Sequence, residues 1–489
     1  MMDNFIYSCL KKIVHKNPLK HAIQIDTIKY TYKKFFEDCL NISDFIIFNK
    51  KNKIGIIGNY SYLSYISVFG SLISGKTYIP INQNLPIIKI KSIIRKSKID
   101  LLIINNSDKK KFKFFKNSIS EIKLLKFKKI YKFKKEYRKQ KIVAKKNAYI
   151  IFTSGTTGEP KGVPISRESF FCYLKWLLNN LKFNKNDSCS QFPNLGFDLS
   201  VVDIFSTILS GSKLYVPKNL FFRNFPGLFI KKFSITHAVF VPSFIDLIEN
   251  ASQLNKKYLK SLKKIFFCGE PLYKHQLTKL FKANPNLEII NAYGPTEATV
   301  SCTKIKLNFR NYRKHCFETV CIGKPIRGIK LFLTNKFIEN KEFKEILLGG
   351  KQVFNGYLND PNLNKKKFIK IKNIKYFKTG DLVKEINNNI YFQKRNDTQI
   401  KIKGYRVELE EVDTIVRKFG ITDVKTIKYN NDLQTFIINN KKFDIQKLDN
   451  FIRDNLPWYM VPNKIIQLKQ FPTNINNKFD INNLKKYVK

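Results

Sequence analysis

The sequence predicts a multidomain α/β protein. Short apolar runs of strand length alternate with segments of helical periodicity, as they do in parallel βαβ units. The length of 489 residues is enough for more than one domain, and the hydrophobic fraction of 43% is typical of a globular chain. Between residues 320 and 395 the strands are short and are separated by Gly and Asn turns, which indicates an added β-rich subdomain.

The expected elements follow in chain order. In the first part we expect strand Ile54–Ile57, helix Tyr62–Ser74 closed by Gly75, strand Tyr78–Ile81, helix Ile87–Lys98, and strands Leu101–Ile104 and Ala148–Phe152. The alternation continues with helices Phe170–Leu181 and Val201–Ser210 and strands Lys213–Val216, Ala238–Val241 and Lys264–Phe267. The β-rich part contains strands Ile329–Thr334, Glu345–Leu348 and Ile390–Gln393. A compact α+β unit with a helix at Glu408–Lys418 begins near Asp397.

Composition argues against several protein classes. The start, MMDNFIYSCLKKIVHK, lacks the apolar core and cleavage site of a signal peptide, and no apolar run approaches the roughly 18 residues that span a bilayer. The eight cysteines include no CxxC pair and have no His-rich companion cluster, which disfavours structural zinc and a disulfide framework. We therefore expect a cytoplasmic protein without membrane insertion.

The formal net charge of +53 suggests a nucleic-acid binder at first sight. The excess is spread along the chain, however, and accompanies many Ile, Asn, Phe and Tyr residues, which share A/T-rich codons with Lys. Coding bias in an AT-rich genome therefore explains the charge without a nucleic-acid partner. Lys109–Lys146 is the most basic segment, and a solvated surface segment is its simplest interpretation.

The segment Thr153-Ser-Gly-Thr-Thr-Gly-Glu-Pro-Lys-Gly162 is the most informative part of the chain. A strand that leads into such a loop presents backbone N–H groups, hydroxyls and an ammonium group, which together suit a phosphate. The loop is not a Walker A element, because Lys161 precedes a glycine and because Pro160 and Pro164 would interrupt the helix that this motif needs. An ordinary Gly/Thr turn is the simpler interpretation, but the ten-residue pattern favours a phosphate loop.

Five further blocks accompany this loop. In chain order they are Phe197-Asp-Leu-Ser200, Asn291-Ala-Tyr-Gly-Pro-Thr-Glu297, Tyr376-Phe-Lys-Thr-Gly-Asp-Leu382, Arg395-Asn-Asp-Thr-Gln-Ile-Lys-Ile-Lys-Gly404 and Leu456-Pro-Trp-Tyr-Met-Val-Pro462. In this order and spacing the chain resembles the adenylate-forming superfamily over nearly its full length. The resemblance implies an N-terminal core, residues 1–396, with two α/β subdomains and a small β-barrel subdomain from about residue 320. It also implies a mobile α+β C-terminal domain, residues 397–489, with Asp397 as the hinge.

Members of this superfamily join a carboxylate to the α-phosphate of ATP and release pyrophosphate. The resemblance implies that Thr153, Ser154, Gly155, Thr156, Thr157 and Lys161 hold the β- and γ-phosphates and that Glu297 carries Mg²⁺. Tyr293 would lie against the adenine, Asp381 would accept from the ribose hydroxyls and Arg395 would assist there. The remaining implied ATP-binding residues are Asn291, Ala292, Gly294, Pro295, Thr296, Phe392, Gln393 and Lys394.

Lys478 matches the superfamily lysine that bridges the substrate carboxylate and the α-phosphate. At about 4 Å and an effective dielectric of 20, two opposite charges attract by about 4 kcal/mol, so its loss would slow adenylation by orders of magnitude. The preceding residue is Asn477 where the superfamily has Gly, and the tail is rich in lysine, so an unrelated surface lysine is the competing interpretation.

Asp198 in the block Phe-Asp-Leu-Ser indicates the substrate class. In the amino-acid-activating branch this carboxylate pairs with the α-ammonium group of the substrate; helix N-capping is the alternative interpretation. The other implied pocket residues are apolar or small: Leu199, Val202, Val239, Phe266, Cys268, Ala292, Val300 and Ser301. They predict a small neutral amino acid, and the strings around Asp198 and Cys268 look most like those of ligases that load D-alanine onto a carrier protein.

We therefore expect transfer of D-alanine to the phosphopantetheine thiol of a separate carrier protein. We expect no carrier domain to be attached, because no carrier attachment motif of the Leu-Gly-Gly-x-Ser type precedes Lys489. The alternatives are an enzyme that loads glycine, L-alanine or proline for peptide or polyketide synthesis, and a degenerate, non-catalytic nucleotide-binding protein. Three superfamily glycines are replaced, by Lys344, Lys394 and Glu410, and such loop changes can misplace ligands without abolishing the fold.

Overall fold

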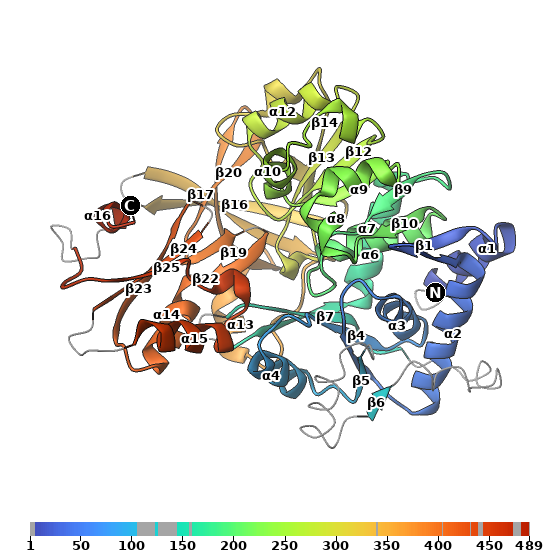
Figure 1. Ribbon diagram of the computed structural model, residues 1–489, viewed down its shortest axis with the longest axis horizontal. Coiled ribbons are helices and arrows are strands. Elements are labelled where there is room, and N and C mark those ends of the chain that lie inside the picture. Colours follow the sequence, from blue (N-terminus) through green and yellow to red (C-terminus); the bar gives the residue numbers. More distant parts are fainter. Residues whose placement is uncertain are drawn as a thin grey trace. The chain divides into compact units, whose positions relative to one another are not determined.

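The computed structural model describes residues 5–104, 123–125, 144–155, 159–338, 341–402, 404–430, 432–438, 444–472 and 481–488 (Figure 1). The chain forms two compact units. The main unit comprises Met1–Gln83, Lys96–Ile151 and Gly162–Lys394, and the second unit comprises Asn84–Arg95, Phe152–Lys161 and Arg395–Lys489. The second unit therefore combines the C-terminal part of the chain with the phosphate-loop segment.

A nine-stranded sheet forms one half of the main unit, in the order β15-β14-β13-β12-β11-β9-β10-β1-β2. Neighbouring strands from β13 to β1 are parallel, while β14, β15 and β2 join the edges in antiparallel pairs. The strands are β1 (His21–Ile25), β2 (Ile28–Thr31), β9 (Ser188–Ser190), β10 (Lys213–Val216), β11 (His237–Phe240), β12 (Lys264–Phe267), β13 (Glu288–Tyr293), β14 (Thr303–Leu307) and β15 (Lys324–Pro325).

A six-stranded sheet has the order β6-β5-β3-β4-β7-β8, with parallel pairing from β6 to β7. Its strands are β3 (Lys53–Ile57), β4 (Thr77–Ile81), β5 (Leu101–Ile104), β6 (Lys123–Leu125), β7 (Asn147–Thr153) and β8 (Lys161–Ser166). The phosphate-loop segment connects β7 to β8. Buried parallel strands explain the nearly continuous apolar runs from which the sequence predicts them.

Helices cover these sheets and fill two apolar cores. The larger core joins residues of α2, α3, α6 and α7 to both sheets, and the second joins α10 and α12 to β12, β13 and β14. Figure 1 shows α10 and α12 against these strands. The helices of the main unit are α1 (Phe5–Lys16), α2 (Tyr32–Phe48), α3 (Tyr62–Ile73), α6 (Arg167–Leu181), α7 (Leu199–Leu209), α8 (Leu220–Asn224), α9 (Pro226–Lys232), α10 (Ser243–Asn250), α11 (Lys256–Leu259), α12 (Lys274–Ala283) and α13 (Pro361–Lys367), with 3₁₀ turns η3 (Thr296–Ala298) and η4 (Tyr312–His315).

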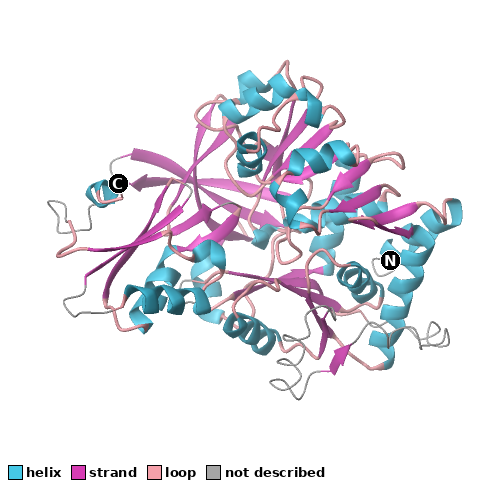
Figure 2. Cartoon of the chain, in the orientation of Figure 1, coloured by secondary structure: helices cyan, strands magenta, loops and turns pink. Residues whose placement is uncertain are grey.

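The β-rich part of the main unit is an antiparallel sheet, drawn as long magenta arrows in Figure 2. It has the order β16-β17-β19-β18, and β20 also pairs with β19. Its strands are β16 (Ile329–Ile338), β17 (Lys341–Gly350), β18 (Phe368–Ile371), β19 (Ile374–Ile386) and β20 (Asn389–Arg395). Apolar side chains of this sheet pack with Tyr293, Ala298 and Cys302, so the sheet is anchored to the end of β13.

The second unit contains small sheets and amphipathic helices. A hairpin of β21 (Gln399–Ile402) and β22 (Tyr405–Glu408) precedes a three-stranded sheet of β23 (Asp423–Tyr429), β24 (Asp432–Ile438) and β25 (Lys464–Gln467). One apolar core joins Val412 and Val416 of α14 (Leu409–Lys418) to Leu448 and Ile452 of α15 (Ile445–Asn455). The unit also holds most of α4 (Ile87–Ser97), the 3₁₀ turn η5 (Trp458–Met460) and α16 (Ile481–Lys486).

The α/β class and the strands and helices named from the sequence are confirmed, with differences at their ends. Helix α6 begins at Arg167, three residues before the predicted start, because the Ser166 hydroxyl caps it by accepting from the Ser169 amide at 3.0 Å. Strands β16 and β17 extend well past their predicted ends, since their antiparallel register runs without a break from the pair Ile329 and Gly350 to the pair Ile338 and Lys341. The division at residue 396/397 and the mobility of the C-terminal domain stay predictions. No helix in the described part of the chain is long and apolar enough to cross a membrane.

Candidate active site

The end of β13 meets the middle of β19 through two predicted nucleotide residues. The Tyr293 hydroxyl donates to Asp381 Oδ2 at 2.6 Å, although 88 residues separate them. Burial raises the pKa of Tyr293 well above its usual value, and the nearby Asp381 carboxylate raises it further, so the phenol keeps its proton. The Asp381 backbone amide donates to Thr379 Oγ1 at 3.0 Å, and Gly380 between them has a φ of 76°. Asp381 is therefore held both by its backbone and by its side chain.

The predicted segment Asn291–Thr296 is buried where it leaves β13. The Asn291 side-chain amide donates to the Cys321 carbonyl at 3.0 Å. Ala292 is 4% exposed and packs in the larger core. A Cβ atom on Gly294 would lie 2.5 Å from the Ser301 Cα, so only glycine fits there. Pro295 then precedes the 3₁₀ turn that carries Thr296.

Glu297, the predicted Mg²⁺ ligand, is fully buried in this turn. Its Oε1 accepts a hydrogen bond from the Tyr357 hydroxyl at 2.6 Å, and its carbonyl oxygen accepts from the Phe354 amide at 2.8 Å. Tyr357 was not predicted as a site residue, because nothing in the sequence distinguishes it from the other 22 tyrosines.

Asp198 occupies the N-cap position of α7, yet its side chain makes no capping hydrogen bond. The capping interpretation is therefore wrong. Burial raises the pKa of Tyr78, Tyr149 and Tyr173, and the Asp198 charge adds to the rise for all three. The carboxylate thus acts on three fully buried phenols that come from β4, β7 and α6.

Most of the predicted pocket residues are buried in one apolar core. Seven of them belong to the larger core, with exposures of 8% or less: Leu199, Val202, Val239, Phe266, Cys268, Ala292 and Val300. The Cys268 thiol lies 3.8 Å from the Val300 carbonyl oxygen, and Ser301 Oγ lies 3.0 Å from the Tyr173 hydroxyl. The chain is strained here, because Thr299 and Val300 have φ values of 58° and 72° although both are β-branched.

The phosphate-loop segment in the second unit is held by residues 406–411 of the same unit. Ser154 Oγ donates to the Arg406 carbonyl at 2.9 Å, and Lys161 Nζ lies 3.4 Å from Glu408 Oε1. Burial raises the pKa of Glu411, and the groups that act to lower it are Lys89 and, more weakly, the backbone amide of Gly155. Thr153 Oγ1 is buried and has no hydrogen-bond partner among the described residues. Thr156 and Thr157 lie outside the described residues, as does Lys478.

The predicted ribose segment crosses from β20 into the second unit. Phe392 and Gln393 are half-buried, and Lys394 is exposed with its ammonium group 4.9 Å from the centre of the Phe343 ring. The Arg395 guanidinium binds Asp397, the predicted hinge residue, through two bonds of 2.7 and 2.8 Å. The structure thus pairs two residues that were predicted to have separate roles, one at the ribose and one at the hinge.

Two of the residues that replace superfamily glycines form ion pairs. Lys344 forms an ion pair of 2.7 Å with Glu385, and Glu410 forms one of 2.8 Å with Arg417. Glu345, next to Lys344, is 5% exposed and accepts a hydrogen bond from the Gly380 amide at 3.2 Å, next to Asp381. The larger side chains at these positions therefore project to partially exposed surfaces.

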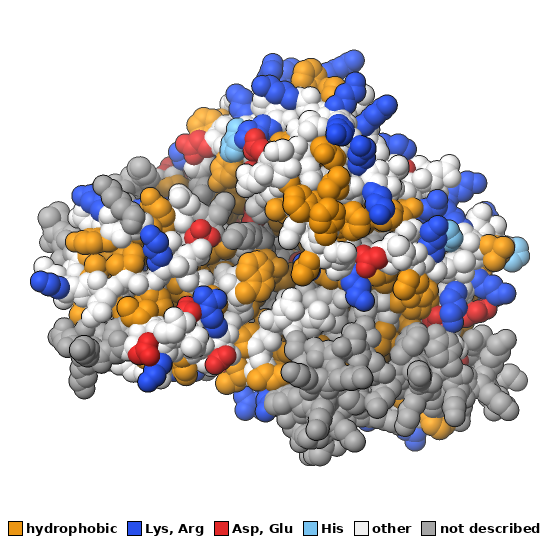
Figure 3. All heavy atoms as spheres, in the orientation of Figure 1, with side chains coloured by type: hydrophobic (Ala, Val, Ile, Leu, Met, Phe, Trp, Pro, Cys, Tyr) orange, Lys and Arg blue, Asp and Glu red, His pale blue; other side chains and the backbone are white. Residues whose placement is uncertain are grey.

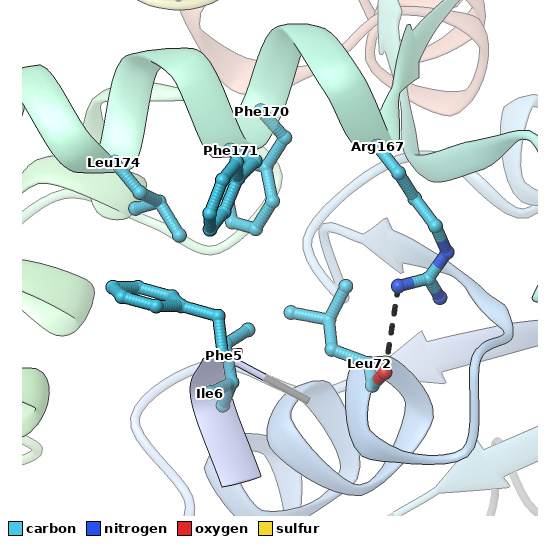
Figure 4. Close-up of a pocket in the computed structure, with 7 residues that line it drawn as sticks. All are labelled: Phe5, Ile6, Leu72, Arg167, Phe170, Phe171 and Leu174. Atoms are coloured by element: carbon cyan, nitrogen blue, oxygen red, sulfur yellow. Dashed lines mark hydrogen bonds between the residues drawn. The ribbon is translucent and has the colours of Figure 1, made fainter. Parts of the chain in front are cut away.

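A small hollow lies apart from these residues (Figure 4). Its lining comes from the N-terminal ends of α1 and α6 and from Leu72 at the end of α3. The Arg167 guanidinium donates from its three nitrogens to the carbonyls of Leu72, Lys76 and Lys145, at 3.5, 2.8 and 3.0 Å. Arg167 therefore satisfies the end of α3 and has a structural role.

On the coloured part of the face seen in Figure 3, lysine and arginine side chains lie among other side chains, and most of the basic segment Lys109–Lys146 lies outside the described residues. The described residues contain no group of three or more His, Cys, Asp or Glu side chains that could hold a metal ion. All eight cysteines are free thiols.

Comparisons with known proteins agree with this arrangement. The AMP-binding enzyme family matches residues 10–358. A D-alanine–D-alanyl carrier protein ligase of Staphylococcus aureus (strain JH9) is 30% identical over 491 residues, covering 97% of each chain. The ligase of that name from Listeria monocytogenes serotype 4a is 28% identical over 473 residues, covering 92% of this chain and 93% of the relative.

Solved structures share the fold. The adenylation domain AlmE of Vibrio cholerae, in complex with glycyl-adenosine-5'-phosphate, superimposes with a TM-score of 0.87 at 23% identity, covering 99% of this chain and 97% of that one. An o-succinylbenzoate CoA synthetase of Bacillus subtilis gives a TM-score of 0.81 at 18% identity, covering 98% and 97%.

Proposed function

This chain is an AMP-forming enzyme of the AMP-binding family, and from that premise we propose that it activates a small neutral amino acid, D-alanine, and loads it onto a carrier protein. The surroundings of Asp198 carry the proposal. The Asp198 charge acts on three buried phenols, so it reaches into an apolar part of the core, where a carboxylate attracts a cation strongly, and the α-ammonium group of an amino acid is such a cation.

Burial of the predicted substrate residues supports a small side chain on the substrate. Cys268, Val300 and Ala292 are 4% or less exposed and bring no charge to the apolar cluster near Asp198. A large or charged substrate side chain would need this cluster to open. The names of the Staphylococcus and Listeria relatives support D-alanine in particular.

The proposed reaction has two steps. First, a carboxylate oxygen of the amino acid attacks the α-phosphorus of ATP, and the bond between the α- and β-phosphates breaks to release pyrophosphate. Second, the sulfur of a pantetheine thiol attacks the acyl carbon, the thiol proton goes to solvent and AMP leaves. Charge grows on phosphoryl oxygens in the first step, so fixed donors and cations act most strongly there.

Named residues take the roles that the family resemblance implies. Lys161, Ser154 and Gly155, with Thr153, Thr156 and Thr157, would hold the β- and γ-phosphates. Tyr293 and the segment Asn291–Thr296 would line the nucleotide, and the Tyr293 bond would orient Asp381 toward the ribose. Phe392, Gln393, Lys394 and Arg395 would complete the nucleotide site, and Lys478 would bridge the carboxylate and the α-phosphate.

Mg²⁺ would bind at Glu297. Mg²⁺ in nucleotide enzymes takes one or two carboxylates, with phosphate oxygens and water as its other ligands, and Glu297 supplies one buried carboxylate that Tyr357 orients. When bound, the ion would neutralise charge on the phosphates.

The experiment is amino-acid-dependent exchange between ATP and labelled pyrophosphate, with D-alanine, L-alanine, glycine, L-proline and D-lactate. We expect the highest kcat/KM for D-alanine and almost none for D-lactate, which lacks the ammonium group. A maximum at another amino acid would reject the substrate, and no exchange with any of them would reject amino-acid activation. Loading is then measured by mass spectrometry on a carrier protein with phosphopantetheine, and the apo carrier protein is the control.

A further inference from the structure

Residues 406–411 engage the groups of the phosphate-loop segment that suit an anion. The Lys161 ammonium group lies 3.4 Å from Glu408 Oε1, and the Glu408 side chain is fully buried. The Ser154 hydroxyl donates to the Arg406 carbonyl at 2.9 Å, and the Gly155 amide lies near enough to the Glu411 carboxylate to lower its pKa, against the larger effect of burial. A cation and a hydroxyl of the loop are thus paired with oxygen atoms of the same chain, and a backbone N–H lies near a third oxygen-bearing group.

A second cation fixes Glu411 in this position. Lys89 Nζ lies 2.5 Å from Glu411 Oε1, and both side chains are less than 10% exposed. Ser92 lies on the same helix as Lys89, α4, and its hydroxyl donates at 2.5 Å to the carboxylate of Glu159 in the loop. A Cβ atom on Gly155 would lie 2.2 Å from the Glu159 carbonyl oxygen, so the turn is too tight for any other residue. Helix α4 and α14 therefore hold the loop from two sides within the second unit.

We propose that Glu408 and Glu411 are an internal anion that competes with pyrophosphate and the triphosphate of ATP for the phosphate loop. The inference depends on the proposed role of this loop in phosphate binding. Lys161 cannot pair fully with Glu408 and with a phosphate at once, and a phosphate beside two buried carboxylates would be repelled. The two occupants therefore exclude one another.

This competition would assist release of pyrophosphate after adenylation. Coupling between two competing ligands is reciprocal. Bound pyrophosphate weakens the contact between Glu408 and Lys161, and this contact lowers the affinity for pyrophosphate by the same factor. The conformer in which residues 406–411 contact the loop then belongs to the enzyme after pyrophosphate has left. AMP has no β- or γ-phosphate, so its binding should not sense the contact.

Charge-neutral variants test the proposal. We expect Glu408→Gln and Glu411→Gln each to tighten binding of inorganic pyrophosphate about three- to tenfold, since they raise the population of enzyme whose loop is open. AMP binding should change less than twofold. Glu410→Gln is the matched control, because Glu410 lies on the same helix but pairs with Arg417 and not with the loop. The dissociation constants are measured by isothermal titration calorimetry on the full chain.

Weaker or unchanged pyrophosphate binding in both variants would overturn the inference, and so would an equal change for AMP, because general destabilisation affects both ligands. Hydrogen exchange on the parent chain gives a second measurement that needs no variant. Saturating pyrophosphate should speed amide exchange in residues 404–411 several-fold, whereas AMP should not; no difference between the two ligands contradicts the competition. A substrate other than D-alanine would leave this inference standing, whereas a parent chain that binds AMP but no pyrophosphate would refute it.

Discussion

Replacing Asp198 by asparagine tests the proposed substrate recognition most directly. The change keeps the shape of the side chain and removes its charge. Because the carboxylate influences three fully buried phenols, it acts in surroundings of low polarity. At about 4 Å and an effective dielectric of 20, its attraction for an ammonium group is about 4 kcal/mol, of which desolvation cancels part. We therefore expect kcat/KM for D-alanine to fall about 10²- to 10³-fold.

The assay compares D-alanine with D-lactate in pyrophosphate exchange. Lactate has a hydroxyl in place of the ammonium group, so the variant should lose most of its preference for alanine while lactate exchange holds or rises. Asp203→Asn is the control, because Asp203 lies on the same helix, is fully buried, and burial raises its pKa well above the usual value. This control should stay within about threefold of the parent, since burial already favours the neutral form of its carboxyl.

A result within threefold of the parent for Asp198→Asn with D-alanine would refute the reasoning. So would an unchanged ratio of alanine to lactate, even at reduced activity, because that pattern indicates damage to the site without loss of amine recognition.

Two further predictions concern buried acids. Tyr357→Phe removes the donor to Glu297 at 2.6 Å, and a hydrogen bond to a charged group contributes about 1.5–3 kcal/mol, so exchange should slow about tenfold or more; a change under twofold would separate Tyr357 from the site. Burial raises the pKa of Asp413 from its ordinary 3.8 to about 6, so the folded state binds the proton more tightly than the unfolded state. The contribution of this group to the free energy of unfolding therefore falls as pH rises from 3.8 to 6, by about 3 kcal/mol in total. The free energy of unfolding in urea, taken as Asp413→Asn minus the parent, should therefore be larger at pH 7 than at pH 4. A smaller difference at pH 7 than at pH 4 would contradict the raised pKa.

Most of the fold was predictable because its strands are short, apolar and bounded by turn residues. The run Ile54–Ile57 is an example: it is buried in a parallel sheet, and its residues are 3% exposed or less apart from the glycine. The 17-residue helix α2 was not among the predicted elements. Its inward-facing side includes Asp38, Ser43 and Asp44, which blur the apolar periodicity on which such a prediction relies.

The sequence motifs that form the candidate site could be predicted, but the hydrogen bonds between their residues could not. Family-like motifs point to Tyr293, Glu297 and Asp381, but the bond from Tyr293 to Asp381 spans 88 residues and depends on how β19 meets β13. The same holds for Tyr357 and for Glu408, which no motif singled out. Both were missed because a buried polar partner is defined by tertiary structure, whereas a single sequence shows only order and spacing.

The segment after β13 shows why this part of the chain tolerates little change. Two consecutive β-branched residues, Thr299 and Val300, sit in the left-handed region at a cost of about 1 kcal/mol or more each. The Thr299 hydroxyl donates to the Gln352 carbonyl at 2.6 Å, and the Cys302 amide donates to the Tyr293 carbonyl at 2.7 Å, which pins both ends of the strained pair. Glu297 and Val300 are only three positions apart in the sequence, yet they contact different partners. The Glu297 carboxylate accepts from Tyr357, and the Val300 carbonyl lies near the Cys268 thiol. The strained pair Thr299 and Val300, stabilised by neighbouring hydrogen bonds, thus links the proposed metal ligand to the proposed substrate pocket.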